Sequence, residues 1–106
     1  MSQPYVYKAI SLTATTSPQN LLAALQAVDP SVLGAYREVN LQNDPGSAVQ
    51  IAVGDDQLVN NTREGYALTI GSSRNYREGL MGGVPIANMY FVCGSGSPRL
   101  NVELIM

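Results

Sequence analysis

The sequence contains no histidine and no tryptophan, and it has a single cysteine, Cys93. Without histidine the chain lacks the usual general base at neutral pH, which excludes Ser-His-Asp and Cys-His nucleophile pairs and His-containing zinc sites. A lone cysteine cannot close an internal disulfide, so a small secreted domain held by disulfides is excluded as well. Composition therefore argues against an enzyme and against a bound cofactor.

Charge and long apolar runs are also scarce. Charged residues make up 13% of the chain, and six basic residues against eight acidic ones give a formal net charge of −2. Neutralisation of phosphates by basic residues supplies most nucleic-acid affinity, so we expect no nucleic-acid partner. No stretch approaches the ~20 consecutive apolar residues that a membrane span needs. Residues 1–5 lack the basic-then-apolar layout of a signal peptide, and we expect no membrane partner.

The 106 residues contain 45% hydrophobic residues, enough for one buried core. A chain of this length corresponds to one domain, and it buries roughly two-thirds of the surface that its unfolded form exposes. We therefore expect a single domain over residues 1–106.

Short runs of alternating apolar and polar residues dominate the chain. Several such runs, separated by turn-forming residues, indicate an antiparallel β-sandwich or barrel. The expected strands are residues 5–12, 35–42, 48–53, 65–70, 74–80, 86–93 and 100–106. In the fourth strand Tyr66, Leu68 and Ile70 are expected to share one face. Leu58 and Val59 are expected to pack on the core, and residues 94–98 to form a hairpin loop. The fold class is thus mainly β, with about seven strands in one sandwich or barrel.

One short α-helix is expected at about residues 18–28. Ser17 is a favourable N-cap, and Pro18 is well suited to the first helical position because it lacks an N–H. Asp29 precedes a proline, which ends the helix. The apolar stripe of this helix comprises Leu21, Leu22, Leu25 and Val28.

Few residues could carry chemistry. Asp55, Asp56 and Glu64 form the only local acidic cluster, but their spacing matches no calcium loop, and such acids are usually solvated turn residues. Cys93 has no basic residue nearby to lower its pKa and is expected to be a small buried residue. We therefore expect no metal site and no catalytic residue.

The most distinctive polar group is Arg74, Tyr76 and Arg77 on the weak strand 74–80. Tyrosine and arginine are enriched at protein interfaces because they combine contact area with directed hydrogen bonds. Tyr5 and Tyr7 have the same character. These five residues are interface candidates, although the strand is equally consistent with an ordinary sheet edge.

The second half of the chain resembles a known group of proteins. Residues 48–59 read Ala-Val-Gln-Ile-Ala-Val-Gly-Asp-Asp-Gln-Leu-Val, and Thr62, Gly65-Tyr66-Ala67-Leu68 and Gly71-Ser72 follow. Ala-Asn-Met-Tyr-Phe-Val at 87–92 and Leu-Asn-Val-Glu-Leu at 100–104 complete the pattern. The pattern is similar to small all-β structural proteins of tailed bacteriophages and covers residues 39–106. Common roles in that group are head decoration (cement) and head or tail accessory functions.

The resemblance implies a non-enzymatic virion protein, above all a capsid decoration protein. It would bind the outer surface of the major capsid protein shell, stabilise the head, and reside on the capsid surface after assembly in the host cytoplasm. A homo-oligomer is expected, and a trimer would need an apolar self-contact near Met81, Pro85 and Met89. Residues 1–5 are a candidate docking arm that orders on assembly.

Two alternatives remain open at this point. The first is a tail or baseplate accessory protein, or a host-adhesion module that binds a glycan through tyrosine side chains. The second is a glycosidase, which needs two carboxylates in a cleft. A chain of 106 residues offers little concavity for such a cleft, although carboxylates are present at Asp55, Asp56, Glu64, Glu78 and Glu103.

Overall fold

Two four-stranded antiparallel sheets form the body of the protein. The computed structural model describes residues 6–56, 58, 65–77 and 83–106, and side chains from Lys8 onward within these ranges. Sheet A has the strand order β1 (Val6–Thr13), β10 (Arg99–Ile105), β4 (Glu38–Asn43) and β7 (Ser73–Arg77). Sheet B has the order β2 (Gln19–Asn20), β9 (Tyr90–Cys93), β5 (Ile51–Gly54) and β6 (Tyr66–Leu68). Every pairing within them is antiparallel.

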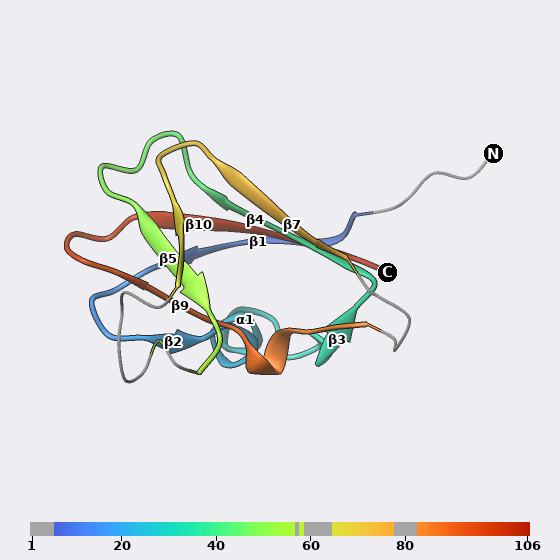
Figure 1. Cartoon of the computed structure of the whole chain (residues 1–106). Coiled ribbons are helices and arrows are strands. Elements are labelled where there is room, and N and C mark those ends of the chain that lie inside the picture. The colour runs from blue at the N-terminus through green and yellow to red at the C-terminus, as the bar shows by residue number, and fades with distance from the viewer. Residues whose placement is uncertain (1–5, 57, 59–64, 78–82) are drawn as a thin grey trace.

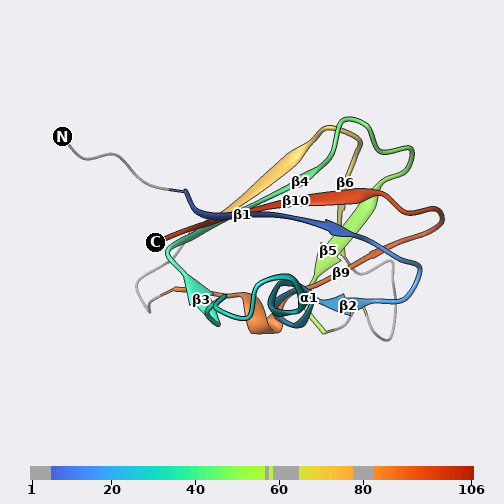
Figure 2. The same cartoon turned by 180° about the vertical axis from the view of Figure 1, so that it is seen from behind.

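The molecule is a two-layer sandwich in which sheet A forms one layer along its whole length. The second layer has two halves, as Figure 1 and the reverse view in Figure 2 show. Sheet B fills one half. The other half holds helix α1 (Leu21–Val28), the 3-10 turn η1 (Ile86–Asn88) and the small sheet of β3 (Ala35–Tyr36) and β8 (Val84–Pro85). The predicted mainly β sandwich with one α-helix is therefore confirmed, and the strands beyond the expected seven are the two-residue strands β2, β3 and β8.

Alternation along the strands places one apolar face of each sheet in the core. In β10 the inward side chains Leu100, Val102 and Leu104 are at most 1% exposed, and the predicted alternation of this strand is confirmed. Ile51 and Phe91 belong to the opposite layer and are equally buried. Fully burying an aliphatic or aromatic side chain contributes about 1.5–3 kcal/mol. The packing of these two buried faces against each other is therefore a large source of stability. Leu58 is also fully buried, as predicted, whereas Val59 lies outside the described residues.

The links between sheets A and B lie at one end of the sandwich (Figure 1). Backbone hydrogen bonds join these links to each other, from Ala14 N to Pro98 O at 2.9 Å and from Cys93 N to Thr15 O at 2.9 Å. Residues 94–98 join β9 of sheet B to β10 of sheet A. The expected hairpin at 94–98 is therefore wrong, because the strands on either side of it pair with other partners.

Asn43 is a buried polar residue that ties the two sheets together. It lies at the end of β4, fully buried. Its Nδ2 donates to Val49 O at 2.9 Å and to Leu68 O at 3.0 Å, both on the sheet B side. Its Oδ1 accepts no hydrogen bond from the described residues. At the point where the two sheets separate, the Asn43 side chain thus supplies the hydrogen-bond donor that these two backbone carbonyl groups would otherwise lack.

Helix α1 begins later than its sequence predicts. Gln19 and Asn20 pair with β9, and Leu21 N donates to Met89 O at 2.8 Å. The N-cap is Asn20, whose Oδ1 accepts from Ala23 N at 3.0 Å. The predicted start at Ser17-Pro18 is wrong, because pairing with β9 holds residues 19–20 in an extended conformation and a good capping residue follows directly.

The helical stripe is also shorter than predicted. Leu21 and Leu25 are buried, but Val28 is 60% exposed, since the helix ends there and Asp29 caps it. Asp29 Oδ2 accepts from Lys8 Nζ at 2.6 Å, which ties the helix end to β1. Lys8 occupies an inward position of β1, and this ion pair explains why a charge interrupts the apolar face.

Several predicted strands differ in detail from the structure. The strand expected at 48–53 begins only at Ile51, and residues 78–80 of the strand expected at 74–80 lie outside the described residues. Residues 35–42 divide into β3 and β4, because β3 pairs with β8 while β4 pairs with β10 and β7. Residues 86–93 begin as the 3-10 turn η1 and become extended only at β9. On β6 only Leu68 is buried. Tyr66 and Ile70 are 52% and 49% exposed, because β6 is a short strand at the edge of sheet B.

Candidate functional site

The structure brings four of the predicted interface residues together at one edge of the sandwich. This edge is formed by β7 of sheet A and β6 of sheet B, which are the outermost strands on the same side of the two sheets. Along β7, Arg74 and Tyr76 are half-buried, whereas Ser73, Asn75 and Arg77 are exposed. A groove of about 410 Å³ lies here. It is lined by Val53, Gly54, Asp55, Tyr66, Arg74, Tyr76, Val84, Pro85, Asn88 and Met89.

Arg74 is the central side chain of this edge groove. Its guanidinium carbon lies 4.0 Å from the centroid of the Tyr66 ring and 5.3 Å from that of the Tyr76 ring. A guanidinium at these distances is attracted to the face of an aromatic ring. The stack links the edges of the two sheets and holds three interface-type side chains in fixed positions. Burial raises the pKa of Tyr76 against the opposing effect of Arg74, so its phenol remains a neutral hydrogen-bond donor.

Sequence reasoning missed Tyr66, because the alternation 66-68-70 suggested an inward face. The signal that could have identified it is its place directly after Gly65. A Cβ on Gly65 would lie 2.8 Å from Val53 O, so only glycine permits this close approach of the chain to β5. The close approach starts β6 at Tyr66 and leaves its ring at the sheet edge.

The other predicted interface residues lie elsewhere. Arg77 points to the outer face of sheet A, with its Nε 4.0 Å from Glu38 Oε1. Tyr7 lies in β1, of which only the backbone is described at this residue, and Tyr5 and Met81 lie outside the described residues. The groove therefore combines Arg74 and Tyr76 with Pro85 and Met89, which the sequence suggested separately.

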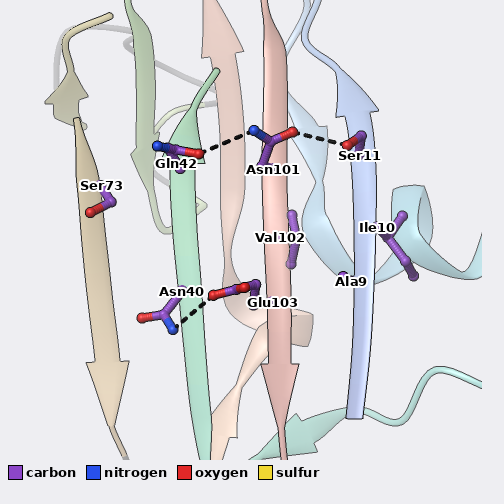
Figure 3. Close-up of a pocket in the computed structure, with 9 residues that line it drawn as sticks. All are labelled: Ala9, Ile10, Ser11, Asn40, Gln42, Ser73, Asn101, Val102 and Glu103. Carbon is purple, nitrogen blue, oxygen red and sulfur yellow. Dashed lines mark hydrogen bonds between the residues drawn. The ribbon is translucent and has the colours of Figure 1, made fainter. Parts of the chain in front are cut away.

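A second concave feature lies on the outer face of sheet A (Figure 3). This polar hollow measures about 560 Å³. It is lined by Ala9, Ile10, Ser11, Asn40, Gln42, Ser73, Asn101, Val102 and Glu103. Of these residues only Glu103 was considered in the sequence, as a carboxylate for the glycosidase alternative. The others were not candidates, since the hollow depends on the register of β1, β10 and β4, which a single sequence does not specify.

Hydrogen bonds between side chains organise the polar hollow in rows across the strands. Ser11 Oγ donates to Asn101 Oδ1 at 2.9 Å, and Asn101 Nδ2 donates to Gln42 Oε1 at 3.2 Å (Figure 3). In the next row Asn40 Nδ2 donates to Glu103 Oε1 at 3.3 Å. The rows follow the strand register, in which Asn101 pairs with both Ser11 and Gln42.

Asp44 lies at the end of the first row. Asn101 Nδ2 also donates to Asp44 Oδ1 at 3.0 Å. This bond, followed by one from Gly46 N, lowers the pKa of Asp44. The carboxylate therefore stays ionised and fixes the Asn101 amide, so that the Asn101 Oδ1 atom points toward Ser11.

The residues considered for metal or nucleophilic chemistry show ordinary environments. Asp55 and Asp56 are exposed, and Glu64 lies outside the described residues. Within residues 6–56, 58, 65–77 and 83–106, no group of three or more His, Cys, Asp or Glu side chains could hold a metal ion. Cys93 is buried as predicted, and burial raises the pKa of its thiol.

No helix in the described part of the chain is long and apolar enough to span a membrane. Comparison with known proteins found no matching family model, no matching curated protein and no matching solved structure. The resemblance to phage structural proteins therefore stays a prediction.

Proposed function

We propose that this protein is a non-enzymatic structural protein of a bacteriophage virion, a capsid decoration protein that binds the major capsid protein. The observation that carries the proposal is the edge groove, in which Arg74 is stacked between Tyr66 and Tyr76. The proposal also draws on the sequence resemblance over residues 39–106.

The groove has the chemistry of a protein-binding site. Tyrosine, arginine and methionine are enriched at the cores of protein interfaces, and Tyr and Arg dominate their binding energy. Pro85 and Met89 add apolar surface beside the stack. Since Arg74 is already held by two rings, it loses little side-chain freedom on binding. A partner segment that lies in this groove would gain from both features.

Low overall charge fits repeated attachment to a shell. Charged groups buried at an interface lose hydration that their new contacts often do not replace. With 13% charged residues, this chain can cover a capsid surface with few such losses. Many weak contacts on a symmetric shell add up through multivalency. We place the protein on the capsid surface as a homo-oligomer, with a trimer as the form to test first, after assembly in the host cytoplasm.

Binding to capsid shells tests the proposal directly. Purified protein is mixed with shells that lack it, sedimented, and quantified by gel densitometry against the capsid protein. We expect saturation at a fixed ratio to the capsid protein. The double variant Tyr66→Ala/Arg74→Ala should lose at least tenfold in affinity, about 1.4 kcal/mol. Arg77→Ala is the matched control, because it removes an arginine of the same strand that points to the outer face.

Other outcomes separate the alternatives. A handful of copies per particle, without saturation on the shell, would contradict decoration and favour a tail or baseplate role. Unchanged binding of the double variant would show that the groove is not the contact surface. Failure to associate with any particle would overturn the virion proposal.

A further inference from the structure

We infer that the polar hollow on the outer face of sheet A is a binding site for a neutral saccharide. The hollow and the edge groove share no lining residue, so this inference does not depend on the proposed contact with the capsid protein. Strand β7 separates the two features, because Ser73 faces the hollow while Arg74 and Tyr76 line the groove.

The shape of the hollow comes from one small residue. Ala9 pairs with Glu103 in the β1–β10 register, and Glu103 pairs with Asn40. In this row Ala9 carries only a methyl group, whereas its neighbours carry long polar side chains. The methyl group therefore forms an apolar floor beside a polar wall. The volume of about 560 Å³ lies within the range of small-molecule sites, ~300–1,000 Å³.

The polar wall is held in place before any ligand binds. Asn101 is fixed on one side by Ser11 and on the other by Gln42, at 2.9 and 3.2 Å. Asn40 accepts at its Oδ1 from Asn75 and donates to Glu103. Side chains fixed by such bonds lose less conformational entropy when a ligand binds.

The remaining hydrogen-bonding capacity fits sugar hydroxyl groups. Glu103 Oε2 and Ser73 Oγ make no hydrogen bond with a described residue, and the Gln42 Nε2 contact with Gly71 O is long, at 3.5 Å. These atoms comprise an anionic acceptor, a hydroxyl and an amide donor. A hydroxyl group both donates and accepts, so a saccharide can satisfy all three kinds of atom. Its C–H face can pack on the Ala9 methyl group.

Charge decides between a neutral saccharide and other ligands. Among the described residues that line the hollow, none is a cation, and Glu103 carries a negative charge. An acidic saccharide or a phosphate would meet repulsion without a compensating cation. An apolar protein surface would dehydrate Glu103 and the amides without replacing their hydrogen bonds with water, which is unfavourable. A neutral saccharide avoids both losses.

A glycan array followed by titration calorimetry tests the inference with the full-length protein. The array contains neutral oligosaccharides together with sialylated and sulfated ones. We expect binding of neutral glycans, with dissociation constants in the micromolar to millimolar range. Ala9→Leu fills the floor of the hollow and should weaken binding at least tenfold. Ala67→Leu is the matched control, because it makes the same exchange at an exposed strand position of sheet B.

A second variant keeps the test independent of packing at the floor. Glu103→Gln removes the charge of an exposed side chain with almost no change in shape, and should weaken neutral-glycan binding several-fold. Three results would each overturn the inference: no neutral glycan binds at millimolar concentration, acidic glycans are preferred, or Ala9→Leu binds as well as Ala67→Leu. Loss of glycan binding in Tyr66→Ala would instead place the site in the edge groove.

Discussion

Asn43 shows how one polar residue can define the fold of an otherwise apolar core. A buried amide is normally unfavourable unless its hydrogen bonds are made. Here the Nδ2 group uses both of its protons on Val49 O and Leu68 O. Leu68 belongs to β6 of sheet B, Val49 lies in the segment that leads into β5, and Asn43 belongs to sheet A. The amide therefore fixes how the two sheets meet. An apolar residue at this position could fill the space but could not specify that alignment.

We predict that Asn43→Ala destabilises the protein by about 2–3 kcal/mol. The substitution leaves two buried carbonyl groups without a donor, and each such group costs about 1–3 kcal/mol before the structure relaxes. Urea denaturation followed by circular dichroism measures the change. Gln50→Ala, at an exposed position, should stay within ~0.5 kcal/mol of the wild type. A change equally small for Asn43→Ala would show that water or rearrangement replaces the amide.

Lys8 and Asp29 make the stability of the protein sensitive to acid. The hydrogen bond from Lys8, followed by bonds from Ser31, lowers the pKa of Asp29 from 3.8 to about 2. A carboxylate with a depressed pKa stabilises the folded state above its unfolded pKa, and this contribution is lost as pH falls toward the folded value. The loss should therefore fall between about pH 4 and pH 2.

We predict that Asp29→Asn removes this acid-dependent loss. Melting temperatures of the wild type and the variant, measured from pH 7 to pH 2, should differ by a few degrees at pH 7 and converge near pH 2. Ser31→Ala provides a graded control, because it removes the Ser31 Oγ bond to Asp29 at 2.7 Å and leaves Lys8 in place. Parallel curves for wild type and Asp29→Asn over the whole range would contradict the assignment.

At the scale of elements, local sequence signals identify the strands better than their ends. The alternation in residues 100–104 reflects one buried face and one solvated face, so it is visible in the sequence and agrees with β10. The start of α1 is different. Ser17-Pro18 is a good local helix start, but Gln19 and Asn20 pair with Phe91 and Tyr90, about 70 residues away. A pairing across such a separation leaves no local signal.

The edge groove and the polar hollow also differ in how far the sequence predicts them. Arg74 and Tyr76 could be predicted, because residue type and position on an edge strand suffice to suggest an interface. The polar hollow could not, because Ala9, Glu103 and Asn40 come from three strands and become neighbours only through the register of sheet A. Individually these residues look like ordinary solvated positions.

We predict that the true helix cap can be identified by mutation. Asn20→Ala should destabilise the protein by about 1 kcal/mol, since it removes the cap to Ala23 N and also the bond from Asn20 Nδ2 to Ala87 O. Ser17→Ala should have an effect within ~0.5 kcal/mol, because Ser17 is exposed and precedes β2. Chemical denaturation of both variants measures the difference. A larger effect at Ser17 would favour the start expected from the sequence.

On the scale of the whole molecule, the sandwich presents separate surfaces for separate contacts. The edge groove lies where the outer strands of sheets A and B meet, and the polar hollow lies on the outer face of sheet A. A decoration protein attached to a shell through the groove could keep the hollow accessible to a saccharide. Because β7 contributes to both features, variants in this strand should be tested for both proposed contacts.

The proposed docking arm, residues 1–5, gives the final prediction. The described part of sheet A begins at Val6, which pairs with Ile105, and the described buried core residues run from Leu12 to Leu104. Removing residues 1–5, with an initiator methionine before Val6, should change the melting temperature by less than about 2 °C, which corresponds to less than about 0.5 kcal/mol of stability. Shell binding should fall at least tenfold, because contacts made only in the assembly contribute only there.

Replacing residues 2–5 by a Gly-Ser segment of equal length separates the contribution of sequence from that of length. A loss of more than about 5 °C on deletion would instead assign these residues to the folded core and remove the docking arm from the binding mechanism.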